Sequence, residues 1–166
     1  MNLKDHDRVK DLSLVSPYTE GAYYYTVKEN KRAKGLPEAN AAECEAILSF
    51  AQTLLEKGVK EDEITLLTPY KQQKIHLSQE CAKLGLFFTT HTVDEYQGKE
   101  NRVVLLSMAF SGRSPSAFLC DERRVNVMTS RAQQLLVLFA NTKNLRSEPA
   151  WDHLLSMMTE LNKATR

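Results

Sequence analysis

Short apolar runs alternate with stretches of helical spacing along most of this chain, and this alternation restricts the fold more than any other feature. Helical stretches at Glu38–Lys57 and Tyr70–Leu84 are each closed by a glycine, and a last helix opens at Glu148. Strands that alternate with helices predict an α/β domain with a mostly parallel sheet and helices on both faces. The apolar runs are Ala22–Val27, Ile64–Pro69, Phe87–Val93, Val103–Phe110 and Leu135–Asn141.

The remaining segments are polar and suggest the domain bounds. Residues 1–20 are predicted to be a lead-in segment, and residues 21–166 to form one domain of ordinary size. The charged connection Glu29–Asn40 is predicted to be a surface loop. Residues 121–134 have no clear period, but Asp121 is suited to cap a helix.

Composition excludes several classes of protein. The net charge is +1, from 22 Lys and Arg against 21 Asp and Glu, so any nucleic-acid surface is expected to be local or shared with another domain. Cys44, Cys81 and Cys120 are odd in number and form no CxxC pair, so neither a disulfide framework nor a metal site is predicted. A reducing intracellular compartment, cytoplasmic or nuclear, is expected. No apolar run approaches the roughly 20 residues of a membrane span, and no membrane partner is expected.

Polar residues follow the predicted strands, where a parallel sheet of this kind binds ligands. They are Thr68-Pro69-Tyr70 and the stretch Thr92–Glu100. A hydroxyl beside a backbone N–H can hold a phosphate of a nucleic-acid backbone, although an ordinary turn or cap needs the same residues. Gly98 allows close approach of a ligand, and Arg131 offers a rigid fork suited to phosphate.

Two features of a complete nucleotide site are missing from the sequence. No GxxxxGK[ST] loop is present to cradle phosphates, and no apolar strand ends in an Asp-Glu pair that could hold a metal ion. We therefore expect this chain not to bind or split a nucleotide well by itself.

Three stretches, taken in order, resemble the second RecA-like domain of superfamily 1 helicases, and most closely the group of RNA helicases of the nonsense-mediated-decay type. ITLLTPYKQQ resembles motif IV with its TPYxxQ pattern, in which Gln73 is the last position. TVDEYQGKE resembles motif V, and ERRVNVMTSRAQQLLVLFAN resembles motif VI with its following strand. The tail Trp151 to Leu155 also agrees, so the resemblance covers residues 22–161.

The resemblance assigns a role to each candidate residue. It implies that Arg131 is an arginine finger that reaches the γ-phosphate of ATP across a cleft between domains. Further nucleotide-binding residues are implied at Gln97, Gly98 and Glu100, and nucleic-acid-binding residues at Thr68, Pro69, Thr92 and Asp94. ATP and its Mg²⁺ would be held mainly by an upstream P-loop RecA-like domain outside this chain.

Two departures from the family pattern are visible. A second phosphate-contacting arginine, expected within an NRxE pattern, is replaced by Ala41 between Asn40 and Glu43. The common TRAR reads Ser130 to Gln133, so Gln133 stands for an arginine. We expect these changes to affect the rate of ATP hydrolysis and not the fold.

The function implied is that of the C-terminal motor domain of an ATP-dependent helicase, one half of a catalytic unit and inactive alone. Its expected partner is single-stranded RNA or DNA, with RNA and 5′ to 3′ travel preferred by resemblance only. An alternative is a RecA-like docking or regulatory module that has lost catalysis, and a further one is a plain α/β domain with a small-molecule site.

Overall fold

A six-stranded parallel sheet forms the centre of the molecule, in a computed structural model that describes residues 21–109 and 121–162. The strand order is β5-β4-β6-β7-β1-β8, and each neighbouring pair is parallel. The strands of this sheet are β1 (Gly21–Thr26), β4 (Ile64–Thr68), β5 (Thr89–Thr92), β6 (Asn101–Ser107), β7 (Ala132–Ala140) and β8 (Thr159–Glu160). The predicted α/β class with a parallel sheet is confirmed.

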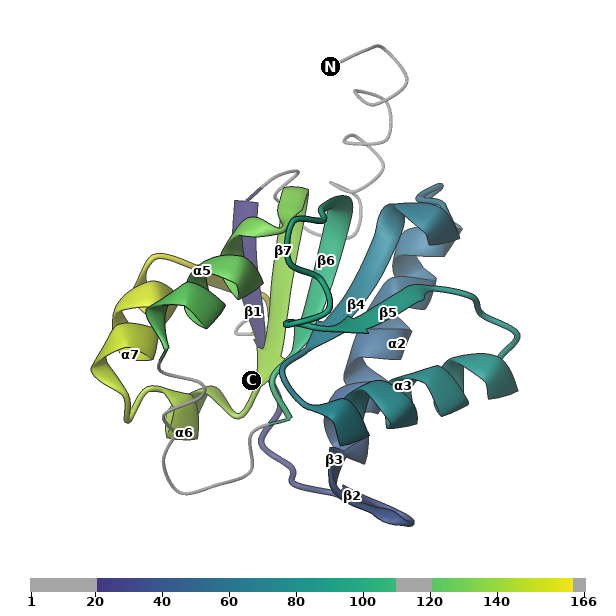
Figure 1. Ribbon diagram of the computed structural model, residues 1–166, viewed down its shortest axis with the longest axis horizontal. Helices are drawn as coiled ribbons and strands as arrows, with labels where there is room; N and C mark the ends of the chain where they lie inside the picture. The colour runs from purple at the N-terminus through teal and green to yellow at the C-terminus, as the bar shows by residue number, and fades with distance from the viewer. Residues whose placement is uncertain (1–20, 110–120, 163–166) are drawn as a thin grey trace.

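Helices cover the sheet on both faces, which gives three layers (Figure 1). One face carries α2 (Ala41–Glu56) and α3 (Lys71–Lys83). The other face carries α5 (Glu122–Ser130), α6 (Thr142–Leu145) and α7 (Pro149–Ser156). A hairpin of β2 (Arg32–Ala33) and β3 (Leu36–Asn40) precedes α2, and a short 3₁₀ helix, η1 (Glu61–Glu63), precedes β4.

The central strand β6 shows why this sheet needs a layer on each side. Val103 and Leu105 point into the cluster beneath α2 and α3, whereas Val104 and Leu106 point into the cluster beneath α5 and α7. All four side chains are fully buried. Successive side chains of a strand alternate between faces, so an unbroken apolar run is what a strand buried on both faces requires.

Several helix ends agree with the predicted signals. Asp121 caps α5 by accepting hydrogen bonds from the N–H groups of Arg123 and Arg124 at 2.9 and 3.2 Å. Gly58 and Gly85 follow α2 and α3 with φ of +98° and +69°, the left-handed region that glycine adopts at least cost. The stretch 121–134, which was ambiguous in sequence, is therefore a helix followed by the first residues of β7.

Some predicted elements were wrong or incomplete. The segment Glu29–Asn40 is no simple loop, because residues 32–40 form the β2–β3 hairpin, and α2 accordingly begins at Ala41 and not at Glu38. The last helix ends at Ser156, and the chain then adds the short strand β8 beside β1. The predicted lead-in segment, residues 1–20, lies outside the described residues. Within the described ranges, no helix is long and apolar enough to cross a membrane.

A buried polar network joins β3, α2, α3 and β6. Gln73 accepts a hydrogen bond from the N–H of Asn40 at 2.8 Å, and its amide donates to the Asn40 carbonyl and to Ser107 Oγ at 3.1 and 2.9 Å. Ser107 Oγ in turn donates to Glu43 Oε1 at 2.8 Å, as does the N–H of Ala109. Gln73, Asn40 and Glu43, which match positions of family motifs, thus tie four elements together.

Glu43 makes the stability of this network depend on pH. Complete burial raises the pKa of the Glu43 carboxyl from 4.5 to about 7, against the opposing effect of its hydrogen bonds. Between these pH values the folded state binds more protons than the unfolded state. The free energy of unfolding should therefore fall by about 3 kcal/mol as the pH rises from about 4.5 to 7.

We expect Glu43→Gln to remove this loss, because an amide keeps the acceptor oxygen for Ser107 and Ala109 but does not ionise. The variant should match wild type near pH 5 and exceed it at pH 8, measured by urea unfolding. Glu45→Gln, at an exposed position of the same helix, is the control and should keep the wild-type pH slope. Equal slopes for Glu43→Gln and wild type would refute this role of Glu43.

Candidate functional site

The loop between β5 and β6, Val93–Glu100, runs from one end of the sheet to the other. Because β5 and β6 are parallel to β4, the loop leaves at the carboxyl ends of the strands and returns at their amino ends. At its start, the N–H of Val93 donates to the Thr68 carbonyl at 2.9 Å. In the middle, Tyr96 is buried, and its hydroxyl lies 3.1 Å from Thr65 Oγ1 near the beginning of β4.

The carboxyl end of β5 presents Thr92 and Asp94 to solvent. Thr92 is half-buried and Asp94 is exposed. Thr92 Oγ1 accepts from the N–H of Glu95 at 3.3 Å, and the N–H of Thr92 donates to Glu95 Oε1 at 2.8 Å, which is a reciprocal cap. The carboxylate of Asp94 accepts from Arg124 Nε at 3.3 Å, so the loop is also attached to the first turn of α5.

Thr68 and Pro69 do not reach the surface, contrary to the expectation that they contact nucleic acid directly. Thr68 has no exposed area, and Pro69 is buried as well. Thr68 Oγ1 instead accepts from the N–H of Tyr70 at 3.3 Å and stabilises the turn into α3. A polar residue at a strand end therefore shapes the edge here and is not itself available to a ligand.

The amino ends of β6 and β7 bring Glu100 and Arg131 together. Arg131 ends α5, its carbonyl accepts from the N–H of Asn101, and its guanidinium donates to the Lys99 carbonyl at 3.4 Å. Its Nε is buried and has no hydrogen-bond partner among the residues that the structure describes. Gln133 donates to Glu100 Oε1 at 3.2 Å. Motif V and motif VI residues thus meet at this end of the sheet.

Gln97 and Gly98 lie in the loop just before this group. Both are exposed, and Gly98 has a φ of +76° with open space where a Cβ would stand. The positive φ, and not crowding, is the reason for glycine at this position. Their sequence neighbours Tyr96, Lys99 and Glu100 line an open polar pocket of about 510 Å³.

Ala41, the first departure from the family pattern, lies at the opposite end of the sheet from Arg131. Ala41 opens α2 at the carboxyl end of the sheet, next to Glu43 and its partner Ser107, the last residue of β6. Arg131 lies at the amino end, so the seven residues of β6, roughly 20 Å at 3.3 Å per residue, stand between them. An arginine at position 41 could not share a phosphate with Arg131 in this arrangement. The expected effect of Ala41 on hydrolysis is therefore not supported.

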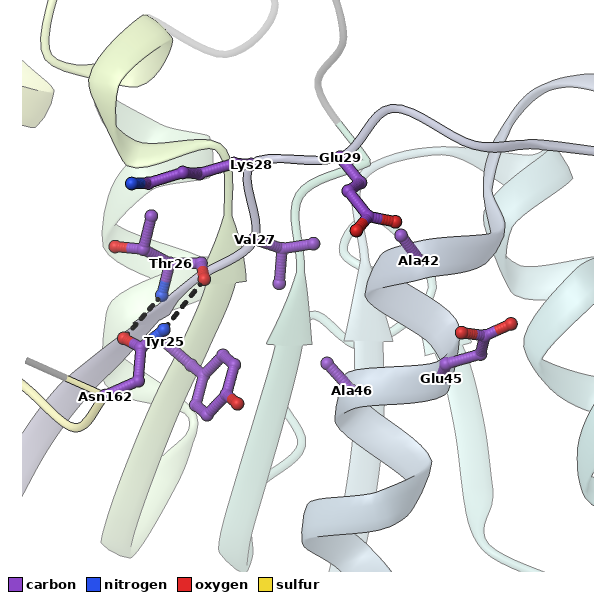
Figure 2. A pocket seen from close by; sticks show the side chains of 9 residues that line it. All are labelled: Tyr25, Thr26, Val27, Lys28, Glu29, Ala42, Glu45, Ala46 and Asn162. Carbon is purple, nitrogen blue, oxygen red and sulfur yellow. Dashed lines mark hydrogen bonds between the residues drawn. The ribbon is translucent and has the colours of Figure 1, made fainter. Parts of the chain in front are cut away.

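An open groove of about 520 Å³ also lies at the carboxyl end of the sheet, between the end of β1 and the first turns of α2 (Figure 2). Asn162 closes one side by pairing with both the N–H and the carbonyl of Thr26, at 3.1 and 2.9 Å. Lys28, Glu29 and Glu45 give its walls charges of both signs. Neither Thr92 nor Asp94 is among the residues that line this groove.

Sequence reasoning missed Lys74, Glu95 and Gln133 as parts of the site. Glu95 had a local signal, since Thr92-x-x-Glu95 is the spacing of a capping box. Lys74 had none, because it meets Glu95 only through the packing of α3 beside β5. Gln133 stands where the family commonly has an arginine, and the structure shows its amide donating a hydrogen bond to Glu100.

Comparisons of the sequence with known proteins identify the family of the chain. Residues 2–143 match the family described as AAA domain. The chain is 37% identical over 128 residues to the helicase required for RNAi-mediated heterochromatin assembly 1 of Schizosaccharomyces pombe, and 32% identical over 128 residues to the ATP-dependent helicase NAM7 of Saccharomyces cerevisiae. It is 27% identical over 161 residues to the regulator of nonsense transcripts 1 homolog of Drosophila melanogaster.

These alignments cover most of the chain and a small part of each relative. They include 73%, 72% and 90% of this chain respectively, but only 13%, 13% and 14% of those proteins. The three motifs, the parallel sheet and the family match lead to one assignment. The chain belongs to the AAA domain family and is a second RecA-like domain of the superfamily 1 helicase type, in the nonsense-mediated-decay group.

Proposed function

We propose that this chain is the C-terminal motor domain of an ATP-dependent helicase that moves along single-stranded RNA. The observation that carries the proposal is the course of the loop Val93–Glu100. It begins beside Thr92 and Asp94 at the carboxyl ends of the strands and finishes beside Arg131 at the amino ends. A single short segment therefore connects a surface suited to single-stranded nucleic acid with one suited to a nucleotide.

At the amino end, Arg131, Gln97, Gly98 and Glu100 are proposed to complete an ATP site. The P-loop, and most of the contacts to ATP and Mg²⁺, would come from an upstream RecA-like domain of the same protein. The Arg131 guanidinium donates to Ser130 Oγ and to the Lys99 carbonyl at 2.9 and 3.4 Å, and its exposed Nη groups are suited to donate hydrogen bonds to phosphate oxygens as well. In the phosphoryl-transfer transition state, Arg131 would stabilise the charge that develops on the γ-phosphate.

At the carboxyl end, Thr92 and Asp94 are proposed to contact the strand, while Thr68 and Pro69 hold the turn behind them. The hydroxyl of Thr92 already accepts from Glu95, so its O–H remains to donate to a phosphate oxygen. Backbone contacts of this kind make binding insensitive to base sequence, and they hold for RNA and DNA alike. ATP-driven closure would shift this contact along the strand, and hydrolysis would reopen the cleft.

Strand-stimulated ATP hydrolysis tests the proposal. The natural polypeptide that contains this chain should hydrolyse ATP faster when single-stranded RNA is added, whereas residues 1–166 alone should show no activity. A polypeptide that hydrolyses no ATP under either condition would instead identify the domain as a docking module.

A further inference from the structure

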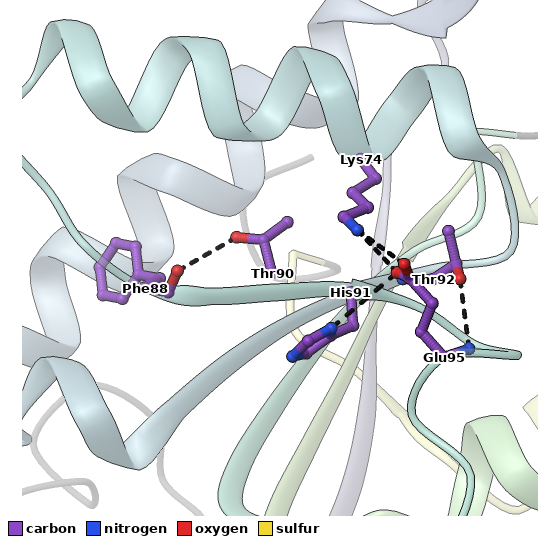
Figure 3. Close-up of polar contacts among 6 residues, drawn as sticks. All are labelled: Lys74, Phe88, Thr90, His91, Thr92 and Glu95. Atoms are coloured by element: carbon purple, nitrogen blue, oxygen red, sulfur yellow. Dashed lines mark hydrogen bonds and ion pairs between the residues drawn. The ribbon is translucent and has the colours of Figure 1, made fainter.

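Lys74 and Glu95 form a compact charged cluster with Thr92, at the carboxyl end of the sheet (Figure 3). Lys74 Nζ lies 2.7 and 2.9 Å from the two carboxylate oxygens of Glu95. The backbone N–H of Thr92 donates to one of those same oxygens, Oε1, at 2.8 Å. An ammonium group and a backbone N–H therefore converge on one anionic oxygen, which is how proteins commonly bind phosphate.

The cluster is accessible to a ligand. The side chains of Lys74 and Glu95 are 29% and 46% exposed, so an anion from solution can reach the donors that Glu95 occupies. His91 approaches the same oxygen at 3.9 Å, and burial lowers the pKa of its imidazole, so it adds little positive charge near neutral pH. The hydrogen bonds from Lys74 and from the N–H of Thr92 lower the pKa of Glu95 to about 2, so the carboxylate is charged throughout the physiological range.

We propose that Lys74 is a further phosphate-binding residue for the single strand, and that Glu95 holds its place as an internal substitute for the phosphate. When a strand binds, one of its phosphates replaces the Glu95 carboxylate at Lys74 Nζ and at the Thr92 N–H. Glu95 then turns toward solvent. This inference rests on the proposed function, because it requires that a strand contacts the carboxyl end of the sheet.

The exchange gives Glu95 a regulatory effect on affinity. While the carboxylate is present, a phosphate must compete for Lys74, and the displaced anion remains nearby. The ion pair therefore lowers the affinity for the nucleic-acid strand. A lower affinity suits a motor that has to release and rebind the strand at each step. The energetic reason is that removing the competitor frees one cation, and each freed cation neutralises a phosphate and releases a counterion.

The test is a binding titration with the natural polypeptide that contains this chain and a fluorescent single-stranded oligouridine, repeated at several salt concentrations. Glu95→Gln keeps an acceptor for the Thr92 N–H but removes the charge. We expect about three- to tenfold tighter binding at low salt, and a slope of log K against log salt that steepens by ~0.7. The double variant Lys74→Gln, Glu95→Gln should show neither the tighter binding nor the steeper slope of log K against log salt.

Glu80→Gln is the matched control. Glu80 pairs with Lys83 at 2.7 Å near the other end of α3, so its replacement changes the net charge equally without touching the cluster. Strand binding by Glu80→Gln should stay within about twofold of wild type, since the pair is remote from the cluster and its side chains are 31% and 73% exposed. Unchanged or weaker binding by Glu95→Gln, with an unchanged slope of log K against log salt, would overturn the proposal. The ion pair would then only stabilise the conformation of the loop. Absence of strand binding by wild type would instead refute the proposed function, and the inference with it.

Discussion

Arg131→Ala should abolish ATP hydrolysis stimulated by single-stranded RNA in the natural polypeptide that contains this domain. An arginine finger is worth ~10³–10⁵ in the rate of phosphoryl transfer, so the residual activity should fall to the level without RNA. Arg131→Lys keeps the charge but not the planar fork, and we expect it to recover only a small part of the rate. The measurement is steady-state ATP hydrolysis at saturating single-stranded RNA.

Two controls make this result specific. Lys60→Ala removes an exposed cation that precedes β4 at the same end of the sheet, and its rate should stay close to wild type. Affinity for the strand without nucleotide should also be unchanged in Arg131→Ala, because Arg131 lies at the opposite end from Thr92. A rate indifferent to Arg131→Ala would show that the finger is another residue.

Trp151→Ala should lower the free energy of unfolding by about 3–5 kcal/mol, the range for removing a large buried aromatic side chain. Trp151 belongs to α7, has no exposed surface and packs into the cluster with Leu136, Leu138 and Leu155. No other described side chain of its size is fully buried. The loss follows from the cavity left beneath α7 and from the apolar contacts removed with the ring.

Urea unfolding followed by circular dichroism measures this loss, since the variant has no tryptophan left for fluorescence. Phe87→Ala is the control, because Phe87 is 79% exposed and its removal should change the free energy of unfolding by no more than about 0.5 kcal/mol. A loss below about 1 kcal/mol for Trp151→Ala would contradict the packing of α7 against the sheet.

The sheet was predictable because its central strands must be apolar on both sides. Val103–Leu106 can only be buried on two faces, and α2 and α3, which cover one face, showed their helical period and the glycines that end them. The β2–β3 hairpin was not predictable in the same way, because its residues are mostly exposed and carry charges typical of a loop. The two-residue strand β8 is too short for any pattern, and it forms through pairing with β1.

The sequence was enough to predict which residues belong to the site, but not where they lie relative to one another. Order along the chain placed Thr92, Glu100 and Arg131 in recognisable motifs, but it could not indicate that they lie at two opposite ends of the sheet. Burial of Thr68 likewise depends on what covers β4, which no local pattern encodes. The partnership of Lys74 with Glu95 spans 21 positions and arises only when α3 packs beside β5.

Coupling between the two ends of the sheet is the central claim, and one measurement addresses it directly. The affinity of the natural polypeptide for single-stranded oligouridine should be determined with and without a non-hydrolysable ATP analogue. Because the loop Val93–Glu100 joins both sites, we predict that the analogue changes the strand Kd by about fivefold or more, within the usual range of coupling free energies. An identical Kd in the two states would contradict the account.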